Sequence, residues 1–263
     1  MLVSFHAPPR ISGRFWPVFM RNWLVWRKLA VPSVIGNIAD PLITLVAFGY
    51  GLGTLVGQID GRPYITFLAS GSIAVSAALA ATFEALYSAY SRMQVQKTWD
   101  AILNAPIALD DIVFAEMLWA VFKSLFSAAA IMFVIFALGI SREPTMLLAL
   151  PVLGFVGVTF ASLALVFNAL AKGYDFFTYY FTLVITPMTF LSGVYFPTTQ
   201  MPAWLQGVAQ VLPLTAAVEL VRPLILGTLP DEVLRPALIL AAYAAGGYYL
   251  ALEIGRASCR ERV

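Results

Sequence analysis

The sequence predicts an all-α protein that crosses a membrane several times. Of its 263 residues, 60% are hydrophobic and only 11% are charged, a composition that ordinary water-soluble domains do not have. Several apolar runs reach the roughly 20 residues that a spanning helix needs. Short polar or Gly/Pro-rich joints separate these runs. We therefore expect a single polytopic membrane domain over residues 1–252.

The first segment, residues 12–30, predicts an interfacial helix. Basic and aromatic residues are interleaved there, so that a helix would have one basic and one aromatic face: Arg14, Phe15, Trp16, Phe19, Arg21, Trp23, Trp26, Arg27 and Lys28. A helix of this kind lies in the plane of the lipid headgroups. A signal peptide is disfavoured, because arginines interrupt the apolar part and no small-residue cleavage site follows.

Six spanning helices are expected from the apolar runs, and a longer segment with charged and proline residues separates the last two. The runs are Ser33 to Val56, Tyr64 to Tyr90, Ile112 to Ile140, Thr145 to Ala171, Phe176 to Phe196 and Val233 to Leu252. Residues 197–232 are apolar in the middle but contain Pro213, Glu219, Arg222 and Pro223. A seventh span would bury an acid, a base and two helix breakers, so we expect two half-helices that enter the outer leaflet. Glu219 and Arg222 are three residues apart and can neutralise each other.

The distribution of Lys and Arg predicts the orientation. Eight basic residues flank the spans on the side of the N-terminus, against four on the other side. Because basic loops stay in the cytoplasm, the N-terminus is expected to be cytoplasmic. Since the chain is expected to lie in a membrane, we expect membrane lipids, and not nucleic acid, among its partners.

The last residues, Glu253 to Val263, break the composition abruptly with three arginines and Cys259. This stretch looks like the in-frame translation of a sequencing adapter, so we expect residues 253–263 to be an artefact. The alternative is a genuine basic tail that follows the positive-inside rule. Either way, a single cysteine provides no disulfide framework.

Catalytic chemistry is not expected in this chain. His6 is its only histidine, so neither a His-based metal site nor a Ser-His-acid triad can form. The sequence also has no G-x-x-x-x-G-K-[ST] phosphate loop. Energy for any uphill transport must therefore come from a partner or from an ion gradient.

Four charged residues lie within the expected spans, namely Asp40, Glu84, Glu116 and Lys123. An unpaired charge at the bilayer centre costs about 2.5–3.5 kcal/mol, so these residues are expected to form a polar cluster in the cytoplasmic half. Glu116 and Lys123 share a helix face, and Glu84 could meet Lys123 from the neighbouring span. The cluster either lines an inner vestibule or only neutralises charges near the headgroups. Spans four to six have no ionisable residue at depth, which disfavours a proton-coupled carrier.

The small residues of the spans favour helix packing over a substrate role, and the aromatic residues have two interpretations. Gly154, Gly157 and the run "ASGSIAVSAALAA" permit close packing between helices. The aromatic residues at the start of the fifth span could stack on sugars, or they could be interfacial anchors: Tyr174, Phe176, Phe177, Tyr179 and Tyr180.

Three stretches resemble the permease subunit of ABC-2 type exporters, most closely the nodulation-protein J branch associated with lipo-chitooligosaccharide export. They are "NIADPLITLVAFGYGLG" (37–53), "SRMQVQKTWDAILNAPIALDDIVFAEMLWA" (91–120) and "LSGVYFPTTQMPAWLQGVAQVLPLTAAVELVRPLILG" (191–227). The resemblance implies a permease dimer with two copies of a separate ATPase, which would carry the ATP and Mg²⁺. It also implies that the N-terminal helix helps to hold the ATPase and that residues 197–232 close the outer mouth.

The resemblance further implies that residues 94–106 form a cytoplasmic coupling helix, which enters a groove on the ATPase. The sequence suits this role. Thr98 can cap the helix, Trp99, Ile102 and Leu103 can anchor it in an interface, and Pro106 can end it. Asp100, or Asp110 and Asp111, could pair with basic groups of the partner, and Asn104 would face water. The alternative is an amphipathic helix that rests on the membrane surface.

The expected function is export of an amphipathic saccharide, in particular a lipo-oligosaccharide, by a transport subunit without its own ATPase activity. Three alternatives remain open at this point. They are a polysaccharide or drug exporter permease, a membrane anchor without transport activity, and a passive lipid scramblase.

Overall fold

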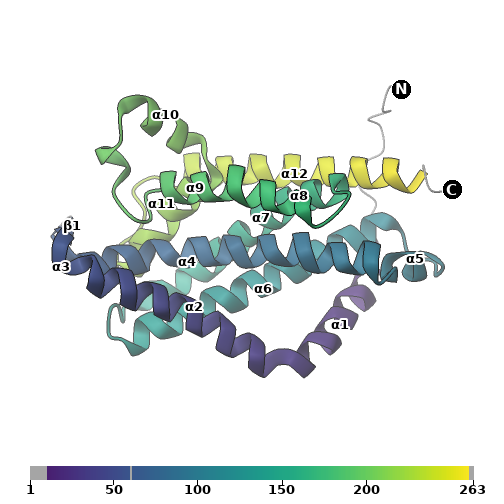
Figure 1. Cartoon of the computed structure of the whole chain (residues 1–263), viewed down its shortest axis with the longest axis horizontal. Helices are drawn as coiled ribbons and strands as arrows, with labels where there is room; N and C mark the ends of the chain where they lie inside the picture. The colour runs from purple at the N-terminus through teal and green to yellow at the C-terminus, as the bar shows by residue number, and fades with distance from the viewer. Residues whose placement is uncertain (1–10, 60, 261–263) are drawn as a thin grey trace.

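The computed structural model describes residues 11–59 and 61–260. His6 and Arg10 lie outside this part. So do the side chains of Asp40 and of residues 258–260, although their backbone lies within helices. The protein is an elongated helical bundle (Figure 1). The expectation of an all-α fold is confirmed, with one small two-stranded ribbon as its only sheet in the described part.

The long helices run along the bundle, and several of the shorter ones lie at its two ends. The elements are α1 (Phe15–Trp26), α2 (Ala30–Gly51), α3 (Gly53–Val56), β1 (Gln58–Ile59), β2 (Arg62–Pro63), α4 (Tyr64–Phe83), α5 (Thr98–Leu103), α6 (Leu109–Ala137), α7 (Ala149–Leu170), α8 (Asp175–Tyr180), α9 (Thr186–Leu191), α10 (Ala203–Val211), α11 (Pro213–Ile225) and α12 (Leu234–Arg260). Three π-helical turns extend or join them: η2 (Glu84–Ser88), η3 (Ser91–Val95) and η5 (Phe181–Ile185). The 3₁₀ turns are η1 (Arg27–Leu29), η4 (Pro144–Leu148) and η6 (Thr198–Gln200).

Four helical stretches in the described part are long and apolar enough to cross a membrane. They are Tyr64–Val95, Leu109–Ala137, Pro144–Leu170 and Leu234–Ala257. The pair α10 and α11 would make a fifth if it counted as one span, but it is bent by 84°. The bend falls at Leu212, and Pro213 then begins α11, where a proline needs no hydrogen-bonded N–H. Pro223, in contrast, lies inside the last turn of α11 rather than at a change of direction.

Helix α7 occupies the middle of the bundle and packs against α4, α6 and α12. Small residues permit these contacts. A Cβ atom on Gly157 would lie 3.0 Å from the Ser124 side chain of α6, and one on Gly247 of α12 would lie 3.1 Å from the backbone of Leu163. Gly154 is less tightly packed, since its nearest neighbour, Leu125, would be 3.7 Å away. The alanine-rich face of α4 is buried in the same core.

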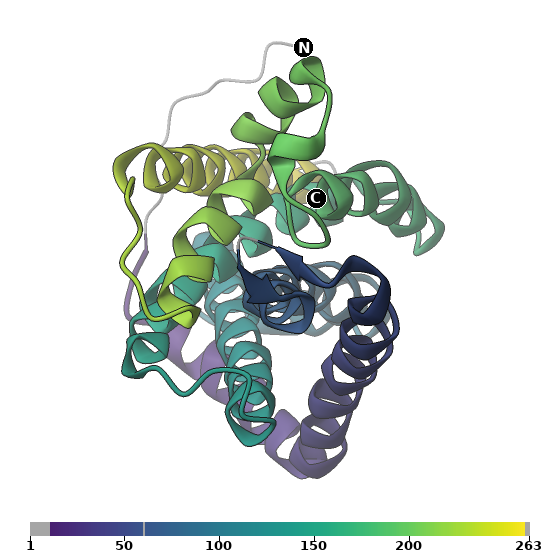
Figure 2. The ribbon, with the colours of Figure 1, turned by 90° about the vertical axis from the view of Figure 1, so that its left-hand side faces the viewer.

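The two ends of the bundle differ in character. At one end, at the left of Figure 1, lie α3, the β-ribbon and α10. At the other end lie α5, the beginning of α1 and the end of α12. Figure 2 views the first end along the bundle, with α2 at the periphery, well separated from α7 and α12.

Candidate functional site

The expected coupling segment forms a short helix at the end of the bundle opposite the β-ribbon (Figure 1). The chain leaves η3 through Lys97, whose positive φ of 53° places it in the left-handed region and turns the backbone sharply. Helix α5 then begins at Thr98, and no side chain caps its N-terminus. The prediction that Thr98 is the N-cap is therefore wrong, because Lys97 occupies that position.

The two faces of α5 have different environments. Trp99 is only 7% exposed, and its indole Nε1 donates a hydrogen bond to Glu116 Oε1 at 3.3 Å. Ile102 is half-buried against the same core. The exposed residues of this segment include Asp100, Leu103, Asn104 and Pro106. The structure thus corrects the expectation that Trp99 anchors a partner, since it anchors α5 to its own bundle.

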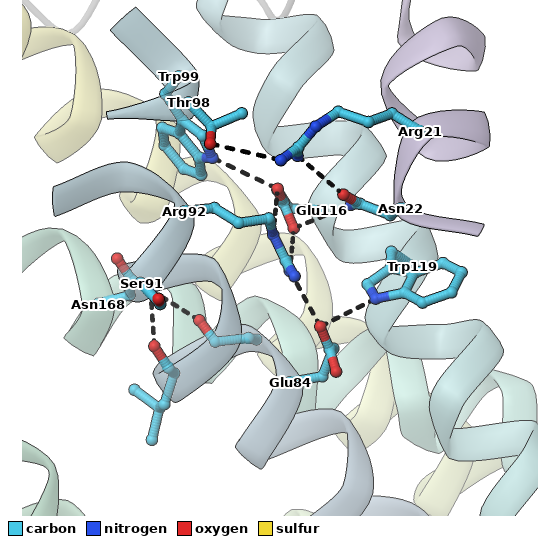
Figure 3. Close-up of polar contacts among 12 residues, drawn as sticks. Arg21, Asn22, Glu84, Ser91, Arg92, Thr98, Trp99, Glu116, Trp119 and Asn168 are labelled. Atoms are coloured by element: carbon cyan, nitrogen blue, oxygen red, sulfur yellow. Dashed lines mark hydrogen bonds and ion pairs between the residues drawn. The ribbon is translucent and has the colours of Figure 1, made fainter. Parts of the chain in front are cut away.

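Glu116 is the centre of a polar cluster beneath α5 (Figure 3). Its side chain is 1% exposed. Arg92 donates to it from Nε at 2.9 Å and from Nη2 at 2.6 Å. The same Nη2 donates to Glu84 at 3.0 Å, and Glu84 also accepts from the indole of Trp119 at 2.9 Å. One guanidinium is therefore shared by two carboxylates, in a region where an unpaired charge would be costly.

Helix α1 is tied to α5 and to this cluster. Arg21 donates to the Thr98 hydroxyl at 3.3 Å, and Asn22 donates to Glu116 at 3.4 Å (Figure 3). Nearer its beginning, Arg14 donates to the carbonyl of Pro106. Burial and the nearby charge of Arg92 lower the pKa of Arg21, and the carboxylate of Glu116 opposes that shift. These contacts fix the direction of α1 relative to α5.

Aromatic packing fixes the rest of α1 on α6. Trp23 and Trp26 meet the ring of Phe122 at centroid distances of 5.3 and 5.5 Å, and Phe19 meets Trp119 at 5.7 Å. The tryptophans that the sequence assigned to the lipid interface are thus partly used within the protein, although Trp16 remains 54% exposed.

The predicted cluster of four charges is partly rearranged. Glu84 pairs with Arg92 rather than with Lys123. Lys123 instead donates to Ser33 Oγ at 3.0 Å and lies over the ring of Trp26, 5.2 Å from its centroid. Asp40 lies in α2, but its side chain is outside the described part.

Arg92 is the residue that the sequence analysis missed. It is eight residues from Glu84, and in an ideal α-helix this spacing places two side chains about 80° apart around the axis. The π-helical turns η2 and η3 have more residues per turn, so the angle between the two side chains shrinks. Asn168 of α7 supports the first of these turns by donating to the carbonyls of Ala85 and Leu86, at 2.8 and 3.1 Å.

Asp110 and Asp111, the other predicted partners of the ATPase, are both buried. Asp110 pairs with Arg256 at 2.5 Å, and Asp111 accepts hydrogen bonds from the backbone and hydroxyl of Ser12, at 2.7 and 2.8 Å. Both carboxylates are therefore engaged inside the chain, and Asp100 is the aspartate that remains exposed.

At the opposite end, the predicted pair Glu219–Arg222 does not form. Glu219 pairs with Arg235 of α12 at 2.9 Å. Arg222 reaches the carbonyl of Gly193 at 2.7 Å, and its guanidinium lies 3.9 Å from the centroid of the Phe67 ring. Although three residues apart, the two side chains reach different neighbours because α11 is packed between α4 and α12.

The aromatic residues at the start of the predicted fifth span fall into two groups. Phe177 and Tyr180 are buried, and the ring of Tyr180 lies 4.2 Å from that of Phe167. Tyr174, Phe176 and Tyr179 are exposed, at 42%, 36% and 64%. Of the five aromatic residues, these three are therefore accessible to a ligand or to lipid in this structure.

Comparison with known proteins assigns the family. The family model described as ABC-2 type transporter matches residues 14–226, which include α1, the polar cluster, α5 and the bent pair α10–α11. The chain belongs to the ABC-2 type transporter family. It is therefore the permease subunit of an ABC exporter and a multi-pass membrane protein, and its family implies a partner ATPase.

Relatives of this ABC-2 permease cover about three quarters or more of the chain. Nodulation protein J of Rhizobium leguminosarum bv. viciae is 49% identical over 80% of this chain and 81% of its own length. Nodulation protein J of Rhizobium meliloti (strain 1021) is 43% identical over 95% of both chains. The inner membrane transport permease YadH of Escherichia coli (strain K12) is 26% identical over 74% of this chain and 73% of its own.

Proposed function

We propose that this permease works as a homodimer with two copies of a separate ATPase and exports an amphipathic saccharide, in particular a lipo-oligosaccharide, across the bacterial inner membrane. ATP and Mg²⁺ bind to the partner. The similarity to nodulation proteins J over most of the chain supports this substrate class over a polysaccharide or a drug. The name of the YadH relative, an inner membrane transport permease, supports the location.

We propose six crossings with a cytoplasmic N-terminus. Beyond the four long apolar stretches, α2 and the helix through α8, η5 and α9 complete the count. Helix α2 has 22 residues, about 33 Å at 1.5 Å per residue, and is therefore long enough to span the hydrocarbon layer. The bent pair α10–α11 enters and leaves on the outer side, and α1 lies along the inner leaflet. The excess of Lys and Arg on the side of α1 and α5 supports this orientation.

Coupling runs through the exposed face of α5. The single observation that carries this proposal is the attachment of α5 to the buried cluster, because Trp99 bonds to Glu116 and Thr98 to Arg21. A displacement of α5 is transmitted to α6 through Glu116, to η3 through Arg92 and to α1 through Arg21. The ATPase contacts Asp100, Leu103, Asn104 and Pro106 on that face, and Trp99 and Ile102 hold it to the bundle.

The experiment is ATP-dependent export in proteoliposomes that contain the permease and the ATPase encoded nearest to it. Asp100→Arg and Leu103→Asp alter the exposed face, and we expect them to reduce co-purification of the ATPase and export at least tenfold. Asp175→Arg is the matched control, because it reverses an exposed acid on α8. Export that needs no ATP would indicate a scramblase. A membrane anchor would bind the ATPase but would not export the substrate. Permease variants would then leave ATP turnover unchanged.

A further inference from the structure

The bend between α1 and α2 presents two exposed basic residues that the coupling proposal does not use. Arg27 and Lys28 lie in η1, which joins the two helices at the bottom of Figure 1. Both side chains are exposed. In the part of the chain that the structure describes, neither forms an ion pair with an acidic residue. Both charges are therefore accessible to a ligand from outside the chain.

Hydrogen bonds fix the shape of this bend. Ser33 Oγ accepts a hydrogen bond from Trp26 Nε1 at 3.2 Å and another from Lys123 Nζ at 3.0 Å. The Lys123 ammonium also lies over the Trp26 ring, 5.2 Å from its centroid. Arg27 and Lys28 thus lie in a turn whose two ends are bonded to each other and to α6. A ligand that binds to them does not have to order the backbone, which would reduce its affinity.

The charges around the bend have one sign. Residues 11–39 include no Asp or Glu, and in residues 117–137 of the facing helix α6 the only charged residue is Lys123. Glu84 is the carboxylate that acts electrostatically on Lys123, but it is itself bound to Arg92 at 3.0 Å. The bend is therefore a locally positive region, which attracts an anion.

Apolar side chains surround the basic residues of the bend. Four of them are exposed, at 42%, 55%, 61% and 71%: Leu24, Val25, Leu29 and Val31. Helix α2, the proposed first crossing, begins at Ala30, so η1 directly precedes the hydrocarbon layer and lies at the level of the inner headgroups. Positive charge beside exposed apolar surface at this depth suits a lipid, whereas an acidic surface of a soluble protein would leave the apolar side chains uncovered.

We propose that the bend between α1 and α2 binds an anionic phospholipid of the inner leaflet. Arg27 and Lys28 donate hydrogen bonds to its phosphate group, and its acyl chains lie against Leu29 and Val31. The half-buried Lys123 adds a third positive charge. This inference rests on the proposed crossing of α2 with a cytoplasmic N-terminus. It goes beyond export, because the lipid is a component of the surrounding membrane and not the transported substrate.

The test is native mass spectrometry of the full chain, titrated with phosphatidylglycerol or with phosphatidylcholine of identical acyl chains. We expect the first phosphatidylglycerol to bind at least tenfold more tightly than phosphatidylcholine. One basic residue near an anionic lipid surface contributes about fivefold, so the double variant Arg27→Gln/Lys28→Gln should bind phosphatidylglycerol about 25-fold more weakly and lose the preference. Lys123→Met should weaken this binding about fivefold. The double variant decides the outcome even if Lys123→Met does not fold, because its two side chains are exposed.

The matched control is Arg62→Gln/Arg142→Gln, which removes two exposed charges at the other end of the bundle and should bind both lipids as the wild type does. Glycerol 3-phosphate, which has the phosphate but no acyl chains, should not displace the lipid.

Three results would overturn the proposal. Equal affinity for the two lipids would exclude recognition of the anionic headgroup, and an equal loss in the control would place the preference outside the bend. An unchanged lipid preference in the double variant, together with weaker co-purification of the ATPase, would make the bend a protein-docking surface. Because the lipid titration contains neither ATPase, ATP nor substrate, its failure is distinguishable from a failure of the proposed export.

Discussion

The charge balance around Glu116 gives the sharpest test of how α5 is held. Glu116→Gln keeps the shape of the side chain and removes its negative charge. Arg92 then loses the carboxylate that it contacts at 2.6 and 2.9 Å and keeps only Glu84 at 3.0 Å. The amide oxygen of the new glutamine can still accept the indole hydrogen bond of Trp99.

The expected cost follows from the burial of these groups. Removing one partner of a buried ion pair costs about 3–5 kcal/mol, because the other charge is left uncompensated. Glu116 is 1% exposed and Arg92 is 13% exposed, but Glu84 still neutralises the guanidinium. The loss is therefore that of charge-assisted hydrogen bonds, and we expect about 1.5–3 kcal/mol. With about 2–4 °C per kcal/mol for a chain of this size, the melting temperature should fall by about 3–12 °C.

The assay combines thermal unfolding of the purified permease with co-purification of the ATPase. Glu116→Gln, Arg92→Met and the double variant are compared in a double-mutant cycle. Each single change leaves a buried charge with fewer partners. The double variant removes one charge of each sign and leaves Glu84, which is 12% exposed. We therefore expect the double variant to be more stable than the sum of the single changes predicts, by at least 1 kcal/mol.

Two results would contradict this reasoning. If both single variants melted within 1 °C of the wild type, the cluster would not contribute to stability as a buried charge network. If the effects of the two changes simply added, Glu116 and Arg92 would not interact energetically, whatever their distance. Loss of ATPase binding at unchanged stability would instead assign Glu116 to the partner interface.

Three further predictions concern helix packing and backbone geometry in the bundle. Gly157→Ala should cost about 1–3 kcal/mol, because its Cβ would lie 3.0 Å from Ser124, whereas Gly154→Ala, on the same face of α7, should be tolerated; melting temperatures of both variants check this. Asn168→Leu should cost about 1–3 kcal/mol, because two carbonyls of a π-helical turn lose their donor. Hydrogen exchange of the backbone amides in residues 84–95 should become faster, and unchanged exchange would contradict this prediction. Gly193→Ala should cost about 1–2 kcal/mol, because the residue has a φ of +76°, and a melting temperature equal to that of the wild type would argue against strain there.

The sequence determined the class of this protein. A hydrophobic fraction of 60% and apolar runs of spanning length leave few alternatives to a helical membrane bundle. The bend between α10 and α11 falls directly before Pro213, and the polar helix between two expected spans formed within residues 94–106. Such features depend on local chemistry, namely hydropathy and the missing N–H of proline. They can therefore be predicted from the sequence alone.

Partner choice among charged and aromatic side chains was decided only by the tertiary structure. Glu84 pairs with Arg92 rather than with Lys123. Two π-helical turns, which contain Glu84 and Arg92, reduce the angle between these two side chains around the helix axis. Trp99 turned inward because a buried carboxylate on α6 was within reach of its indole. Glu219 and Arg222 separated because α11 is packed between two different helices. Residue spacing predicts neighbours along an ideal helix, but which neighbour a long side chain reaches depends on packing between helices that are distant in the sequence.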